Sequence, residues 1–226
     1  MSPVFVPSSG PGDWKSLLAD PTTQWARGYS ARTLAHSWED ADGFPPEIAR
    51  TLKQNPAFAG IKPLLVFPEW RVSLPGGSRP SQNDAWVLAK ADDQLVSIAI
   101  EGKVAESFDK TLGEWKKDAS QGKDIRLAFL QQQLGLSAPI PDDVRYQLLH
   151  RAASAVVEAR RFNASHAVML VHSFHPDNLW FQDDFLKFLA LFGAKANVDQ
   201  LVTVSPAGSL PLHMGWVHGD ERFLTA

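Results

Sequence analysis

The sequence predicts a mixed α/β fold in which one central sheet is flanked by helices. Three observations lead to this class: strand-like segments in a meander between residues 63 and 104, helical spacing between residues 108 and 159, and a segment, His166–Phe174, whose centre is apolar on both faces. A strand that is apolar on both faces belongs inside a sheet covered by helices. Because 226 residues suit one substantial core, we expect a single domain over residues 1–226.

The N-terminal part is expected to hold a surface arm followed by short helices. Residues 1–13 are rich in proline and glycine, which interrupt regular structure, so we expect them to lie on the surface as an arm. Helices are predicted at Asp13–Leu18, Ala31–Trp38 and Pro46–Lys53, the last beginning with a proline suited to a first turn. We expect these helices to cover one face of the sheet.

The next segments predict a strand, a loop and a hairpin. Residues 64–74 carry the branched and aromatic side chains that favour a strand, and Pro75–Asn83 consists of turn-forming residues. Asp84–Lys90 and Leu95–Val104 then predict two antiparallel strands joined by a tight acidic turn, Ala91–Gln94.

Helical spacing follows the hairpin. Apolar residues predict helices over 108–119, 127–134 and 144–159, with Gly122 interrupting the first two, Asp124 as a cap and Gly135 as the end of the second. After the buried strand, the spacing of phenylalanines predicts a helix over 181–192. Gln200–Pro206 and Leu212–Val217 predict late strands, so we expect residues 175–226 to extend and complete the fold.

Composition excludes several classes of protein. The chain has no cysteine, which removes disulfides, thiolate metal sites and cysteine nucleophiles. A net charge of −3 gives no general attraction to nucleic acid. No apolar run is long enough to span a membrane, and the first residues do not have the pattern of a signal peptide. We therefore expect a cytoplasmic protein without a membrane partner.

Candidate chemistry lies at the end of the predicted hairpin. Because side chains alternate along a strand, Glu101 and Lys103 share the face opposite to that of Ile98 and Ile100. The tight turn brings Asp84 to the same end. Two carboxylates at one point repel each other unless a cation lies between them, and a hard ion such as Mg²⁺ or Mn²⁺ suits oxygen ligands. The three charged groups therefore predict a hydrolytic metal site.

The constellation formed by Asp84 and Glu101-Gly102-Lys103, with Pro80-Ser81-Gln82-Asn83 ahead of the aspartate, resembles the PD-(D/E)XK nuclease superfamily. The resemblance covers residues 46–174 and implies a restriction-endonuclease-like core with the order αβββαβ. It implies that Asp84, Glu101 and Lys103 are catalytic. It also implies that Asp84, Glu101 and the Gly102 carbonyl bind the metal, with Glu47 as a candidate for a further acid. Within the superfamily the chain looks like an uncharacterised bacterial family, so no substrate accompanies the match.

We expect a metal-dependent nuclease that acts on DNA or RNA, and two alternatives stay open. A non-catalytic binding or interaction module with the same fold would fit the lack of positive net charge. A small-molecule hydrolase would need a closed pocket. In a purely structural interpretation, Glu101 and Lys103 form only a solvated ion pair, which contributes little to stability. The oligomeric state is left open. His172 and His175 are expected in solvent or turn roles, and His166, His213 and His218 are unclustered in the sequence.

Overall fold

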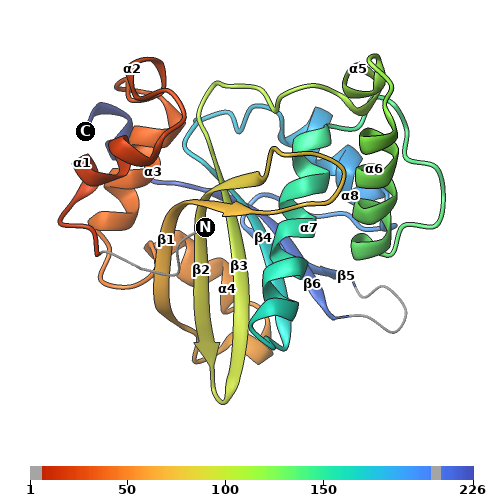
Figure 1. The fold of residues 1–226 in the computed structure, drawn as a ribbon. Coiled ribbons are helices and arrows are strands. Elements are labelled where there is room, and N and C mark those ends of the chain that lie inside the picture. Colours follow the sequence, from red (N-terminus) through yellow and green to blue (C-terminus); the bar gives the residue numbers. More distant parts are fainter. Residues whose placement is uncertain (1–6, 205–209) are drawn as a thin grey trace.

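The computed structural model of the chain describes residues 7–204 and 210–226 (Figure 1). Its described strands form one open six-stranded sheet in the order β1-β2-β3-β4-β6-β5. The first three strands pair antiparallel, β4 runs parallel to both β3 and β6, and β5 is antiparallel to β6. The mixed α/β class is therefore confirmed. The strands are β1 Lys62–Val72, β2 Ser81–Ala91, β3 Gln94–Lys103, β4 His166–Ser173, β5 Gln200–Val204 and β6 Leu212–His218.

Helices flank the sheet, and two hydrophobic clusters fill the space between sheet and helices. The described helices are α1 Pro11–Trp14, α2 Pro21–Gln24, α3 Ser30–Glu39, α4 Pro46–Leu52, α5 Leu112–Lys116, α6 Gln121–Leu134, α7 Tyr146–Arg161 and α8 Leu186–Ala190, with a π-helical turn, Phe181–Phe185, before α8. Helix α7 packs on β3 and β4. Figure 1 shows α6 beside α7, and α4 behind the sheet.

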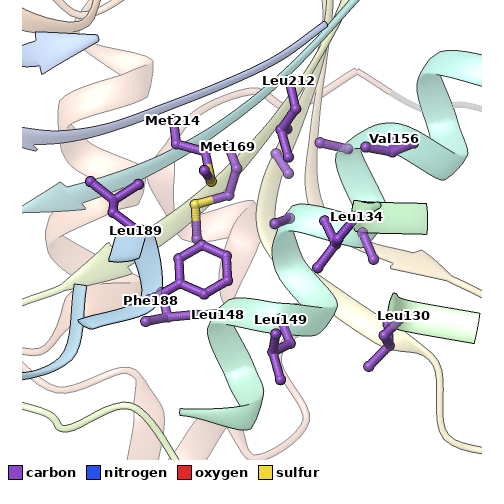
Figure 2. Packing of buried hydrophobic residues seen from close by; sticks show 14 of the residues in the cluster. Leu130, Leu134, Leu148, Leu149, Val156, Met169, Phe188, Leu189, Leu212 and Met214 are labelled. Atoms are coloured by element: carbon purple, nitrogen blue, oxygen red, sulfur yellow. The ribbon is translucent and has the colours of Figure 1, made fainter. Parts of the chain in front are cut away.

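Strand β4 contributes to both clusters, as its two apolar faces predict. Met169 and Val171 belong to the first cluster, with α6, α7 and α8, and Figure 2 shows part of this packing. Val168 and Leu170 belong to the second cluster, with α1, α3 and α4. All four side chains are fully buried. Burial of both faces explains why a chain with many polar residues keeps this segment apolar.

The N-terminal helices cover one face of the sheet, as predicted. Trp14 of α1, Leu34 of α3 and Ile48 of α4 are buried in the second cluster. The predicted surface arm is shorter than expected because α1 already begins at Pro11. Residues 1–6 of that arm lie outside the described part of the chain.

Several boundaries differ from the prediction, and three of them change the start, length or cap of an element. Strand β2 begins at Ser81, inside the expected loop, because Ser81 pairs with Val72 of β1. The helix expected over 108–119 is reduced to α5, since Phe108 fills the core from a loop and Thr111 caps the helix with Glu114. Helix α6 is capped by Ser120 rather than Asp124.

The C-terminal segments complete the sheet. Strand β6 lies between β4 and β5. The end of the predicted strand Gln200–Pro206 lies outside the described residues after Val204. Gly135 ends α6 in a left-handed conformation, with φ 66°, as predicted. Within the described ranges, no helix is both long and apolar enough to cross a membrane.

Candidate functional site

The β2–β3 hairpin places Asp84 and Glu101 opposite each other. Its register pairs Ala85 with Ile100, so the adjacent residues Asp84 and Glu101 face each other at the end away from the hairpin turn. Ala85 and Ile100 pack in the second cluster, and alternation therefore directs both carboxylates to the α7 face. The Asp84 side chain is 22% exposed and that of Glu101 is 2% exposed.

Glu101 is the centre of a buried polar network. Its Oε1 accepts hydrogen bonds from Lys103 Nζ and Gln147 Nε2, each at 2.7 Å. Its Oε2 accepts a hydrogen bond from Arg151 Nε at 2.5 Å. Gln147 and Arg151 are one helical turn apart on α7, so both side chains reach the sheet from the same helix face. Glu101 and Lys103 are therefore a buried ion pair and not the solvated pair of the structural interpretation.

Asp84 is held from two sides. Its Oδ2 accepts a hydrogen bond from the Gly102 backbone N–H at 2.7 Å. Its Oδ1 lies 3.9 Å from a terminal nitrogen of Arg151. A Cβ atom at Gly102 would stand 3.3 Å from both Asp84 Oδ2 and Leu34 Cδ2, which is tighter than most contacts. The glycine of the Glu-Gly-Lys segment thus lets the aspartate approach the strand.

Glu69 of β1 is a third carboxylate at this site. It lies between Pro68, which pairs with Ala85, and Trp70, which pairs with Asn83, and this places it across from Asp84. Its backbone is left-handed, with φ 51°, a conformation that costs a residue with a side chain on the order of 1 kcal/mol. Glu69 Oε2 accepts a hydrogen bond from Gln82 Nε2 at 2.6 Å.

The three carboxyl groups differ in pKa because their surroundings differ. Burial, reinforced by the charges of Glu101 and Glu69, raises the pKa of Asp84 well above its usual range. Burial also raises the pKa of Glu69 to about 7. Burial opposes ionisation of Glu101 too, but Arg151 and Lys103 outweigh it and hold its pKa below the usual value. Glu101 is therefore the ionised member, and burial favours the protonated forms of its two carboxyl neighbours.

These groups line a cavity of about 530 Å³. Its other wall comes from the α2–α3 region and includes Tyr29, Ser30 and Ala31. Glu106 fixes this wall to the end of β3, because its carboxylate accepts hydrogen bonds from the backbone N–H groups of Ser30, at 2.8 Å, and Val104, at 2.9 Å. A ligand in the cavity would contact both the sheet end and the N-terminal helices.

The structure brings together Asp84, Glu101, Gly102 and Lys103, but it places Glu47 elsewhere. Glu47 lies on α4, where its Oε1 is 2.9 Å from Nε2 of the fully buried His172. Sequence reasoning missed Glu69, Gln82, Gln147 and Arg151. For Gln147 and Arg151 a signal was present, since their spacing places both on one helix face, but nothing in the sequence indicated which strand that face meets.

One expectation about histidines was wrong, and one pair of histidines meets only in the folded chain. His172 is buried against Glu47 and does not face solvent. His166 and His213 are far apart in the sequence, but Nδ1 of the first is 3.0 Å from Nε2 of the second, because β4 and β6 are neighbours. His175 has the expected turn role, since its Nδ1 accepts a hydrogen bond from the Asp177 backbone N–H.

The donor chemistry of the site suits a hard divalent cation. Asp84, Glu69 and Glu101 supply carboxylate oxygens. Burial is the main cause of the raised pKa values of the first two, and a bound cation would favour their ionised forms. In the geometry observed, both oxygens of Glu101 are already engaged by Lys103, Gln147 and Arg151. Among residues 7–204 and 210–226, no group of three or more acidic or histidine side chains is arranged as a metal site.

Comparison with known proteins assigns a family to the chain. No curated protein and no solved structure matches it significantly. One family model matches residues 7–221, which include every strand of the sheet and all the residues of the site. The chain therefore belongs to the family described as a domain of unknown function, DUF6946.

Proposed function

We propose that the protein is a metal-dependent phosphodiester hydrolase of the nuclease type, acting on DNA or RNA. One observation carries the proposal: Asp84 and Glu101 lie opposite each other on one face of the hairpin, and Lys103 Nζ lies 2.7 Å from Glu101. The site also opens into a cavity of about 530 Å³. Paired carboxylates beside a lysine supply a cation site and a positive donor, the parts that phosphodiester hydrolysis needs.

The order of the elements supports a restriction-endonuclease-like core as part of this proposal. Helix α4 precedes the antiparallel meander β1–β3, and α7 then leads to β4, which is parallel to β3. The proposed core thus spans residues 46–174. The short helix α5 and the longer helix α6 lie between β3 and α7.

In the proposed mechanism, Asp84, Glu101 and the Gly102 carbonyl would hold Mg²⁺ or Mn²⁺. When bound, such an ion makes coordinated water more acidic and polarises a phosphoryl oxygen. Lys103 is 5% exposed and has its ammonium 4.7 Å from the centre of the Phe108 ring, so its position is fixed. From there it would donate a hydrogen bond to the negative charge that develops on the phosphate.

The test is cleavage of single-stranded and double-stranded DNA and RNA with Mg²⁺ or Mn²⁺. We expect wild-type protein to cut at least one of these, and Asp84→Asn and Lys103→Met to lower the rate by 100-fold or more. Asp93→Asn is the matched control, since Asp93 is fully exposed and follows the same strand at the turn end of the hairpin. Cleavage that survives both site substitutions in folded protein would reject the proposal.

A non-catalytic binding module is a second candidate, and one observation favours it. Arg151 and Lys103 already pair with the charge of Glu101, and with Gln147 they engage both of its oxygens. A buried carboxylate whose charge is paired in this way can contribute to the specificity of the fold without any catalytic role. Calorimetric titration with Mn²⁺ separates the two functions, because a degenerate site would give no heat that depends on Asp84.

A further inference from the structure

We infer that Arg151 is a built-in counter-ion that competes with the divalent cation for the Asp84–Glu101 pair. The inference deepens the proposed function, on which it rests, by naming what limits metal binding at the same site. It assigns to Arg151 the role of limiting metal binding rather than a catalytic one.

The geometry of Arg151 carries this inference. Its Nε donates to Glu101 Oε2 at 2.5 Å, one terminal nitrogen lies 3.9 Å from Asp84 Oδ1, and the other donates to Ser81 Oγ at 3.1 Å. The guanidinium thus touches one carboxylate and approaches the other. A cation bound by both carboxylates would have to use the same oxygen atoms.

Lys103 does not have this position. Its ammonium contacts Glu101 Oε1 and the Gln147 side-chain oxygen, on the other side of Glu101 from Arg151. Glu101 can therefore keep Lys103 while it exchanges Arg151 for a metal ion. The two cations of the site therefore differ in position. Lys103 contacts only Glu101 of the carboxylate pair, whereas Arg151 lies near both carboxylates.

Charge strengthens the argument. In the ionised form that binds a metal, Glu69, Asp84 and Glu101 carry three negative charges against the two positive charges of Lys103 and Arg151. Removing Arg151 would leave a larger negative excess in a buried place, where charges interact more strongly than in water. The Arg151 side chain is 8% exposed, so solvent does little to screen it.

The experiment is a titration of metal-free protein with Mn²⁺, followed by calorimetry and by the electron paramagnetic resonance signal of free Mn²⁺. We compare wild type with Arg151→Met, which keeps the length of the side chain and removes its charge. We expect the dissociation constant to fall at least tenfold in R151M, and the gain to disappear when Asp84→Asn is added. Arg160→Met is the matched control, because Arg160 lies on the same helix but contacts Gln133, away from the cavity, and should leave affinity unchanged.

A second measurement uses wild-type protein, in case R151M does not fold. The Nε–H resonance of Arg151, assigned in ¹⁵N-labelled protein, should shift on titration with Mg²⁺ because the bond to Glu101 is broken. An affinity in folded R151M equal to or weaker than that of wild type would overturn the inference, as would an unchanged Arg151 resonance at saturating metal.

The outcomes distinguish the inference from the proposed function. Tighter binding in R151M without any cleavage by wild type would keep the inference and reject the nuclease. Cleavage by wild type with no gain in R151M would keep the nuclease and reject the role of Arg151. Absence of Mn²⁺ binding in both proteins would reject the inference directly.

Discussion

His213 is a buried histidine whose partners favour its neutral form. It is 2% exposed, and its ring contacts His166 Nδ1 at 3.0 Å and Thr203 Oγ1 at 2.8 Å. Burial, with the nearby His166, lowers the pKa of His213 to about 4. Burial also lowers the pKa of His166. A second proton on this pair is therefore unfavourable in the folded state.

We predict that this pair makes stability depend on pH. Because its folded-state pKa lies below the unfolded value near 6.5, His213 contributes stability that is full above pH 6.5 and is lost as the pH falls toward 4. The loss should approach roughly 3 kcal/mol, at about 1.4 kcal/mol per unit of pKa. Urea unfolding at several pH values, compared between wild type and His213→Gln, measures it. An equal loss of stability in both proteins would contradict the prediction.

The carboxylate site was predictable at the scale of single residues because local rules apply within one hairpin. Alternation along β3 and a tight turn were enough to place Glu101 across from Asp84. Arg151 follows Glu101 by 50 residues and reaches it only through the packing of α7. Glu69 has a left-handed backbone directly after Pro68, and proline indicates an edge strand or an irregularity without indicating that conformation.

Helix α6 depends on a close approach to the loop after β1. Arg126 of this helix donates hydrogen bonds to the backbone carbonyls of Leu74, Pro75 and Arg79, at 2.8–2.9 Å. A Cβ atom on Gly122 would lie 2.6 Å from the Gly76 carbonyl oxygen. The prediction that Gly122 interrupts a helix was therefore wrong. Gly122 lies within α6 and allows the loop to contact it.

We predict that Gly122→Ala lowers the free energy of unfolding by about 1–2 kcal/mol, since overpacking against backbone, at up to about 3 kcal/mol, outweighs the gain of about 1 kcal/mol that alanine gives in a helix. Gly12→Ala in α1 is the control, because a Cβ there meets nothing within 4 Å, and it should be neutral or slightly stabilising. Thermal and urea unfolding measure both variants. A more stable G122A protein would show that the loop yields.

The elements that the sequence predicted least well are those set by distant partners. Phe108 and Trp115 have helical spacing, but the helix begins only at Leu112, and Thr111 before it forms a bridge with Arg145. Trp115 stacks on Tyr146 of α7 with ring centres 4.2 Å apart. The apolar pattern indicated which side chains are buried, and packing against α7 decided the backbone. Strand β4 was predictable because burial on both faces leaves a local pattern.

The whole molecule is one sheet with a hydrophobic cluster on each face, and β3 and β4 supply side chains to both. Ala99 and Met169 belong to one cluster, while Ile98 and Val168, their neighbours in the chain, belong to the other. Loss of packing on either face therefore removes support from the same two strands. The two clusters should act as one cooperative unit.

We predict that Leu149→Ala in the first cluster and Ile48→Ala in the second each lower the free energy of unfolding by about 2–5 kcal/mol, because both side chains are fully buried. In each variant the urea transitions followed by circular dichroism and by tryptophan fluorescence should keep coincident midpoints. Leu64→Ala is the control, since Leu64 is 50% exposed, and it should change stability by less than about 0.5 kcal/mol. An early, separate transition in the Ile48→Ala protein would mean that the N-terminal helices unfold independently, and the wall they form opposite Asp84 and Glu101 would then be a mobile part of the site.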